Sequence, residues 1–411
     1  MKRRHFLSTA AGAIVAGATM NANSSARAAR FKELDKVFAD VMTKHHAPGA
    51  AGVVFDRTGV IWSKAYGYAN TERREKMTLD SIQNIGSVSK TFTATAAMQL
   101  EERGLINLEA DVSDYLGFKL RNPNHPRSPI TLKQLLTHTS SLRDGDAYVQ
   151  TYACGDSRLA LGPWVEAFFL PGGAYYSRAT NFETWGPGEG WKYCNVSWSV
   201  VALVVERVSG IPFPAYCRRN IFRHLNMPST SWLLADIDQD RHSTPYSWIE
   251  EASATSGVWG GNALGVIKPD GPTLNRPLAS GFHENCLYSH PNYPDGFLRS
   301  SANDLSRYLM AYANGGIAFG RRILKAETIE KMLTLVELPG DGDDKNYGLT
   351  WRTEFDLGGE TAWGHGGRDP GVRTEVAILP QRGAGGVVVA NSDGNAPQDA
   401  ITEMLKITLQ S

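Results

Sequence analysis

The sequence predicts a mixed α/β fold of the α+β kind, in which an antiparallel sheet is flanked by helices and carries a mostly helical insertion. Two observations predict this class. Runs rich in β-branched residues, separated by tight turns, occur near the start and again near the end of the chain, whereas helical patterns and long irregular stretches fill the middle. A sheet built from about residues 30–100 and 300–411, with a helical region over about 101–299, explains that order.

The first elements of the fold are expected soon after residue 50. Gly52–Phe55 and Val60–Tyr68 are β-rich and are separated by the turn Asp56–Gly59, so they predict a hairpin. Thr91–Leu100 combines small and apolar residues at helical spacing, and Gly104 follows as a stop signal. A strand pair followed by a helix is therefore predicted at this end of the domain.

The middle of the chain carries weaker signals. A helix is predicted over Ile130–Leu136, with Thr131 as its N-cap. Residues 140–190 and 230–300 are rich in Gly, Pro, Trp and Tyr and lack a regular period. We therefore expect long surface loops in both stretches, and loops of that length in a compact domain are usually functional.

The end of the chain returns to strand patterns. Thr374–Leu379 and Gly386–Ala390 are β-rich runs on either side of the turn Pro380–Gly383. The amphipathic stretch Ile401–Leu409 then predicts a final helix.

Composition narrows the classes of function. The 411 residues contain 42 acidic and 42 basic side chains, and this balance argues against a nucleic-acid partner. No apolar run reaches the roughly 18 residues of a transmembrane helix, so none is expected. The chain contains neither a CxxC nor an HExxH motif. We expect no metal and no cofactor, and a small-molecule substrate as the partner; the oligomeric state is left open.

Residues 1–28 have the features of a signal peptide rather than of folded structure. Arg3 and Arg4 stand before an apolar stretch, Ala10–Ala18, and Ala26 and Ala28 form a small-x-small cleavage site. The paired arginines resemble a twin-arginine export signal. We therefore expect one mature domain over 30–411, periplasmic or secreted; an unstructured basic N-terminus is the alternative.

Cysteine usage fits export without fixing a disulfide pattern. The mature chain has four cysteines, which allow three complete pairings, and their spacing selects none: Cys154, Cys194, Cys217 and Cys286. Cys194 is interpreted as a packing or disulfide residue and not as a nucleophile.

The first candidate for chemistry is the SxxK sequence Ser87–Lys90. Residues three apart share one face of a helix, so the Ser87 hydroxyl and the Lys90 amine can meet. A serine hydroxyl needs a neighbouring base to become a nucleophile, and a lysine serves as that base only if its pKa is lowered. The alternative is a capped helix with a solvated lysine.

Two further segments favour the catalytic interpretation. Tyr193 and Asn195 form a YxN sequence after the turn Pro187–Gly188, and His365–Arg368 precedes a predicted strand. The order SxxK, YxN and then a K/H-x-G sequence before a late strand resembles the serine β-lactamase and penicillin-binding-protein family. D-aminopeptidases, D-alanyl-D-alanine carboxypeptidases and related esterases share this order. The resemblance covers nearly all of the mature chain and implies a β-lactamase/transpeptidase-like fold.

The resemblance implies a role for each residue. Ser87 would form the acyl-enzyme, with Lys90 and Tyr193 sharing the proton transfers; which of the two is the base in acylation is left open. Asn195 would hydrogen-bond Lys90 or the substrate carbonyl, and His365 and Gly367 would lie along the substrate. The oxyanion hole would consist of the backbone N–H groups of Ser87 and Arg368.

One departure from the family pattern affects the substrate. His365 stands where β-lactamases carry a lysine, and histidine is only partly charged near neutral pH. Arg368 or Arg373 could hold a substrate carboxylate instead; the alternative for both is a solvated surface arginine. We therefore expect hydrolysis of an ester, an amide or a D-residue peptide. A β-lactamase or D-alanyl-D-alanine carboxypeptidase, and a non-catalytic binding module, are the alternatives.

Overall fold

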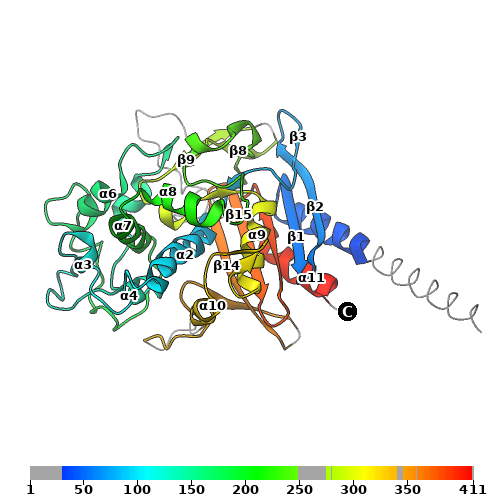
Figure 1. Cartoon of the computed structure of the whole chain (residues 1–411). Helices are drawn as coiled ribbons and strands as arrows, with labels where there is room; N and C mark the ends of the chain where they lie inside the picture. Colours follow the sequence, from blue (N-terminus) through cyan, green and yellow to red (C-terminus); the bar gives the residue numbers. More distant parts are fainter. Residues whose placement is uncertain (1–29, 249–274, 279, 340–345, 358, 410–411) are drawn as a thin grey trace, which may run out of the picture.

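The computed structural model describes residues 30–248, 275–278, 280–339, 346–357 and 359–409 (Figure 1). The expected signal peptide, residues 1–28, lies outside the described residues. Among the described residues no single helix is long and apolar enough to cross a membrane, although the bent pair Ser197–Ser209 and Phe213–Phe222 passes on length and composition together.

The main sheet has seven strands, all paired antiparallel, in the order β13-β14-β15-β16-β1-β2-β3. Three come from the start of the chain: β1 (Gly49–Asp56), β2 (Gly59–Asn70) and β3 (Glu75–Lys76). Four come from the end: β13 (Arg352–Asp356), β14 (Thr361–Asp369), β15 (Val372–Leu379) and β16 (Ala384–Ala390). The two ends meet where β16 pairs with β1, so the predicted sheet is confirmed.

Helices cover both faces of this sheet (Figure 1). A helix over residues 30–44 and α11 (Ala396–Leu409) pack on one face, where Phe38, Val54 and Met404 belong to one apolar cluster. α2 (Ser89–Glu102) and α9 (Ala302–Ala313) belong with the other face, whose larger core takes the neighbouring Val53. Successive strand residues thus point to opposite layers, as the pleat requires.

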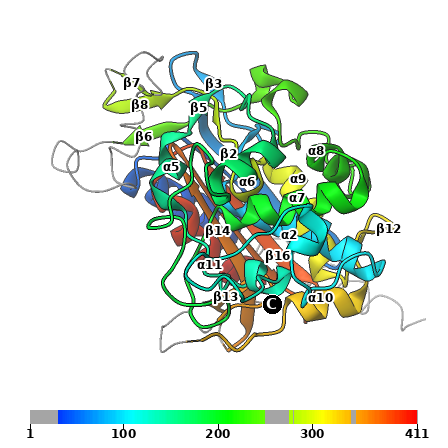
Figure 2. The same cartoon turned by 90° about the vertical axis from the view of Figure 1, so that its left-hand side faces the viewer.

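The chain between the two halves of the sheet forms the helical region. Its central helix is α7 (Ser197–Ser209), which packs against α2 (Figure 2). Around this pair lie α3 (Ser113–Leu116), α4 (Leu132–Leu136), α5 (Gly145–Gln150), α6 (Leu161–Phe169) and α8 (Phe213–Cys217). The helix predicted over Ile130–Leu136 is confirmed as α4, and Thr131 caps it by accepting a hydrogen bond from the backbone N–H of Gln134.

The expectation of continuous loops over 140–190 was wrong, because α5 and α6 lie there. α6 places Leu161, Trp164, Val165, Phe168 and Phe169 at helical spacing on its buried face, but this period spans only nine residues and its first turn contains Gly162 and Pro163, which are typical of loops. The 230–300 stretch contributes short strands: β6 (Tyr246–Trp248), β7 (Asn275–Pro277), β8 (Phe282–Asn285), β9 (Tyr288–Ser289) and β10 (Arg299–Ser300). Outside it, β4 (Gln83–Asn84) pairs with β10, β11 (Ile317–Ala318) pairs with β12 (Arg321–Arg322), and α10 (Ala326–Met332) follows.

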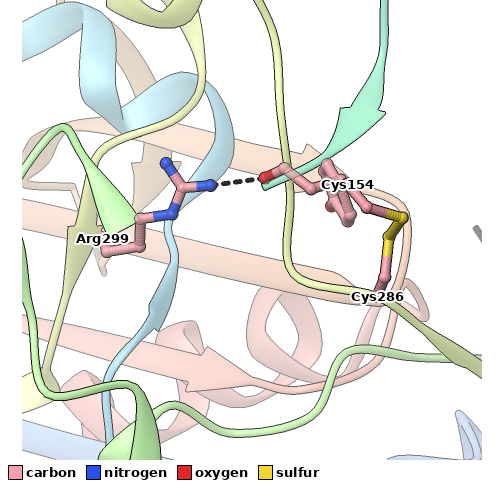
Figure 3. The surroundings of a disulfide bond; sticks show 4 residues. Cys154, Cys286 and Arg299 are labelled. Atoms are coloured by element: carbon pink, nitrogen blue, oxygen red, sulfur yellow. Dashed lines mark hydrogen bonds between the residues drawn. A yellow bond between two sulfur atoms is a disulfide. The ribbon is translucent and has the colours of Figure 1, made fainter. Parts of the chain in front are cut away.

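One disulfide joins two of these irregular stretches. Cys154, on the short strand β5 (Ala153–Cys154), is bonded to Cys286, and β5 pairs with β9. The buried Arg299 donates a hydrogen bond to the backbone carbonyl of Tyr288, the residue opposite Cys154 (Figure 3). Cys194 and Cys217 are buried free thiols, so Cys194 is a packing residue.

Candidate active site

Ser87 lies in a 3₁₀ turn, η1 (Gly86–Val88), directly before α2. Gly86 takes a positive φ of 53°, and its N–H donates to Asn84 Oδ1 over 2.8 Å. Among residues 81–100, only Ser87 is half-buried, and all the others are buried. Ser89 is buried, and its Oγ accepts a hydrogen bond of 3.0 Å from the Leu298 N–H. Ser87 is therefore the hydroxyl of this segment that a substrate can reach.

Lys90 is fully buried beneath Ser87. Its Nζ donates three hydrogen bonds: to Ser87 Oγ at 2.9 Å, to Asn195 Oδ1 at 2.8 Å and to the backbone oxygen of Asp295 at 2.8 Å. These are all the donors that an ammonium group has. The contact that the SxxK spacing predicts is confirmed.

Tyr193 and Asn195 lie beside the lysine. Lys90 Nζ is 5.0 Å from the centroid of the Tyr193 ring. The ring of the half-buried Tyr193 stacks on the imidazole of His138, with centroids 4.3 Å apart. Asn195 donates from Nδ2 to Asp144 Oδ2 at 2.8 Å, and this bond turns its Oδ1 toward Lys90. The structure thus brings the SxxK and YxN residues together.

The charge of Lys90 is set by opposing effects. Burial lowers its pKa, but Tyr193 and Asp295 outweigh burial and raise the pKa above its ordinary value. Lys90 is therefore an ammonium in the resting site. A lysine acts as a base only if its pKa is lowered, and the pKa of Lys90 is raised. This direction disfavours Lys90 as the base in acylation.

Strand β14 lies with its backbone against the Ser87 turn. A Cβ atom on Gly367 would lie 2.0 Å from the carbonyl oxygen of Ile85 and 3.2 Å from the nitrogen of Ser87. A Cβ atom on Gly86 would lie 2.5 Å from the nitrogen of Arg368. Because neither glycine has a side chain, the backbone nitrogens of Ser87 and Arg368 can lie close together, as the predicted oxyanion hole requires.

His365 does not provide the partial positive charge expected of it. The side chain is buried, and burial lowers its pKa well below the ordinary range, with Arg352 and Lys90 acting in the same direction. Nδ1 lies 2.7 Å from the Gly366 carbonyl oxygen, so Nδ1 carries the proton. His365 is a neutral imidazole in a buried strand position, and sequence patterns do not reveal that burial.

The two candidate arginines differ from each other. Arg373 donates to Glu375 Oε1 at 2.8 Å and to Gln398 Oε1 at 3.0 Å, so its guanidinium is already paired inside the protein. The Arg368 side chain is exposed. Arg373 is thus a largely buried arginine whose charge is paired with Glu375, and not the solvated surface arginine that was the alternative.

Sequence reasoning did not single out several residues of the site. His138 supports the Tyr193 ring and accepts a hydrogen bond of 3.1 Å at Nδ1 from the Cys194 N–H. Burial lowers the pKa of His138 to about 3. Asp144 and Asp295 lie in the aperiodic stretches 140–190 and 230–300, where no motif marks them.

Solved structures share this fold. The octameric penicillin-binding protein homologue from Pyrococcus abyssi aligns with a TM-score of 0.70 and 24% identity, over 92% of this chain and 77% of that chain. The D-amino acid amidase from Ochrobactrum anthropi SV3 aligns with a TM-score of 0.70 and 19% identity, over 91% of this chain and 98% of that chain. Likenesses at these identities define the fold class as β-lactamase/transpeptidase-like.

The sequence comparison goes further. Residues 34–408 match the Beta-lactamase family, so the chain belongs to this family. Penicillin-binding protein 4* of Bacillus subtilis (strain 168) is 27% identical over 298 residues, which are 69% of this chain and 60% of the Bacillus protein. The resemblance drawn from the three motifs is confirmed.

Proposed function

We propose that this protein is an exported serine hydrolase that acts through an acyl-Ser87 intermediate on an ester, an amide or a D-residue peptide. The observation that carries the proposal is the 2.9 Å hydrogen bond between the solvent-reaching Ser87 hydroxyl and the buried Lys90 amine. A non-catalytic binding module would not need a buried ammonium under an accessible serine.

The reaction follows from this geometry. Ser87 Oγ forms a bond to the substrate carbonyl carbon and gives up its proton within the Lys90–Tyr193 pair. The carbonyl electron pair moves onto oxygen, where the N–H groups of Ser87 and Arg368 stabilise it. When the carbon–leaving-group bond breaks, the same pair protonates the leaving group. Water then attacks the acyl carbon, its proton returns through the pair, and Ser87 is regenerated.

The site favours esters and amides over β-lactams as substrates. Where β-lactamases carry a lysine, the neutral His365 adds no positive charge. The D-amino acid amidase that shares the fold supports an amide substrate, whereas the name Penicillin-binding protein 4* supports the β-lactam alternative. The two hypotheses predict different ratios of kcat/KM for an ester or amide and for a β-lactam.

Kinetics on the purified mature enzyme test the substrate class. We expect a higher kcat/KM for a p-nitrophenyl ester or a D-amino acid p-nitroanilide than for a chromogenic cephalosporin. The Ser87→Ala variant is the control, and it should turn over none of them while melting like the wild type. A higher kcat/KM for the cephalosporin would replace the esterase or amidase reading with the β-lactamase reading.

Export rests on two independent observations. Arg3 and Arg4 stand before an apolar stretch and a small-x-small site, and the folded domain carries the Cys154–Cys286 disulfide, which persists in oxidising compartments. In a Gram-negative host the mature protein should lie in the periplasm and begin at Ala29 or Arg30. Replacing Arg3-Arg4 by Lys-Lys should retain it in the cytoplasm. An uncleaved cytoplasmic wild type would refute export.

A further inference from the structure

The last residue of β14 is a buried aspartate that reaches the segment leading into the Ser87 turn. Asp369 follows Arg368, whose backbone nitrogen is one of the two expected oxyanion donors. The Asp369 side chain is buried, and its Oδ2 accepts a hydrogen bond of 3.2 Å from Asn84 Nδ2. Asn84 lies two positions before Gly86, the first residue of the turn. One carboxylate therefore joins the end of the strand to the start of the turn.

Asn84 carries this connection into the turn itself. Its Oδ1 accepts the N–H of Gly86 over 2.8 Å, at the residue that takes a positive φ of 53°. The Asn84 backbone is paired with Arg299 in the short β4–β10 ladder, so the amide is also fixed at its base. The carbonyl of this amide therefore binds the turn, while its NH₂ group binds the strand.

A third segment packs against the same contact. Gly296 follows the 3₁₀ turn η5 (Tyr293–Asp295). A Cβ atom on Gly296 would lie 3.5 Å from Asp369 Oδ2 and 3.9 Å from the carbonyl carbon of Gly86. The carboxylate and the turn are therefore neighbours inside a packed region, and their closeness does not depend on the hydrogen bonds alone as evidence.

Other donors hold the remaining acceptors at this end of β14. Asp369 Oδ1 accepts from the hydroxyl of the buried Tyr152 over 2.9 Å. The carbonyl oxygen of the next residue, Pro370, accepts from the Tyr288 hydroxyl over 2.7 Å. Three side chains from distant parts of the chain thus fix the strand end: Asn84, Tyr152 and Tyr288.

The contact with Asn84 does not require a charged carboxylate. Burial, reinforced by Asp295, raises the pKa of Asp369 to about 7, and the hydrogen bonds from Tyr152 and Asn84 and the charge of Lys90 oppose the rise. The ionised form accepts hydrogen bonds at both oxygens. In the protonated form Oδ1 can donate to the Tyr152 hydroxyl, which is able to accept, while Oδ2 still accepts from Asn84. The link to the turn therefore persists in both forms.

From these contacts we infer that Asp369 is a positioning residue of the oxyanion hole. Through Asn84 it fixes the strand end that supplies the Arg368 N–H relative to the turn that supplies the Ser87 N–H. The hydrogen bonds of the side chain carry this role, and its negative charge does not. The inference rests on the proposed acyl-serine function and deepens it, because it names the side chain that aligns the two donors.

The role is distinct from that of the two glycines. Gly86 and Gly367 permit the close approach of turn and strand because they lack side chains, but a missing side chain supplies no attraction. The Asn84–Asp369 bond does supply one. Because a misplacement of about 1 Å in a catalytic group can cost about a hundredfold in rate, a loosened strand end should be visible in kcat.

Two substitutions separate the hydrogen bonds from the charge. Asp369→Ala removes both bonds, so kcat for a p-nitrophenyl ester should fall by about ten- to a hundredfold while KM stays unchanged. Asp369→Asn imitates the protonated acid, because its Oδ1 can accept from Asn84 and its Nδ2 can donate to the Tyr152 oxygen. This conservative variant should therefore keep kcat near the wild-type level.

Asn84 provides a second, independent route to the same connection. Asn84→Ala should reproduce the loss of kcat. The double variant Asn84→Ala, Asp369→Ala should be no slower than the slower single variant, because both substitutions break one link. Phenylboronic acid, which adds to the Ser87 oxygen as a tetrahedral boronate, should bind Asp369→Ala more weakly by the factor that kcat/KM loses.

Asp304→Ala is the matched control. Asp304, on α9, is likewise a buried aspartate, and burial raises its pKa to about 6. It accepts from the Ser229 N–H and from the Thr230 hydroxyl, both outside the contact between β14 and the Ser87 turn. Asp304→Ala should melt at a lower temperature and keep its kcat. Should Asp369→Ala melt too low to assay, Asn84→Ala and Asp369→Asn decide.

Three results would overturn the inference. A folded Asp369→Ala or Asn84→Ala enzyme with wild-type kcat would show that strand and turn align without this link. An Asp369→Asn enzyme as slow as Asp369→Ala would assign the effect to charge. Fully additive losses in the double variant would show that the two residues act separately. A wild type that neither turns over the ester nor accepts a label on Ser87 would instead overturn the proposed function, and the inference with it.

Discussion

Gly86 lies so close to the backbone nitrogen of Arg368 that a Cβ atom at position 86 would be only 2.5 Å from it. The turn that presents Ser87 and the strand β14 therefore meet main chain to main chain. Gly367 makes the reciprocal approach from β14 to Ile85 and Ser87. The site depends on two glycines that are far apart in the sequence and contact each other's segments.

The first prediction concerns these glycines. Gly367→Ala should lower kcat by roughly a hundred- to a thousandfold, the loss typical of one missing oxyanion donor, because the new Cβ pushes β14 away from the Ser87 turn. Gly104→Ala is the control: Gly104 has a positive φ of 69°, unlike Gly367, but its Cβ would meet nothing within 4 Å. That control should lose stability by about 1–2 kcal/mol and keep its kcat. A Gly367→Ala enzyme with wild-type kcat would contradict the predicted oxyanion hole.

The second prediction concerns pH and His138. The pKa of its imidazole is about 3 in the folded protein, whereas an unfolded histidine titrates near 6.5. The unfolded state therefore binds more protons below about pH 6.5, and the stability that neutral His138 contributes is lost as the pH falls toward 3. Between about pH 6.5 and about pH 5 the wild type should lose about 2 kcal/mol more than His138→Asn.

Urea unfolding of both proteins at the two pH values measures this difference. Asparagine is chosen because it tolerates the positive φ of 60° at position 138. Buried carboxylates act equally in both proteins and cancel. His224→Asn, at an exposed position, should match the wild-type pH dependence. Equal slopes for the wild type and His138→Asn would show that His138 protonates in the folded protein.

The third prediction concerns the disulfide. The Cys154–Cys286 bond closes a loop of 132 residues, and Cys154 follows α5 closely in the chain. The double variant Cys154→Ser, Cys286→Ser should lose about 2–5 kcal/mol of unfolding free energy. Reductant should lower the melting temperature of the wild type but leave that of the double variant unchanged. A double variant as stable as the oxidised wild type would show that this loop needs no covalent closure.

The fold could be predicted where turn residues and a regular apolar period mark an element in the sequence. The hairpin of β1 and β2, the helix α2 and the late strands β15 and β16 follow turn residues and periodicity that the sequence shows directly. α6 was missed because its apolar period spans only nine residues and its first turn contains Gly162 and Pro163, which are typical of loops. The pairing of Cys154 with Cys286 depends on tertiary contacts between distant loops, which spacing does not encode.

The residues of the site could also be predicted only in part. Ser87, Lys90, Tyr193 and Asn195 stand in short motifs, and the structure brings them together. The charge states of Lys90 and His365 were not predictable, because each depends on burial and on partners from other segments. Asp295 is more than 200 positions from Lys90 along the chain, so the contact between the two residues could not be predicted from sequence spacing.

The most direct test of the account is to identify the residue that a fluorophosphonate probe modifies in the mature, folded protein. After labelling and proteolysis, mass spectrometry should place the adduct on Ser87 in the peptide that also contains Ser89 and Lys90. Ser87→Ala should remain unlabelled with its melting temperature unchanged, whereas Ser89→Ala should still be labelled on Ser87. An adduct on Ser89 or on any other residue, or labelling that persists in Ser87→Ala, would contradict the assignment of Ser87 as the nucleophile.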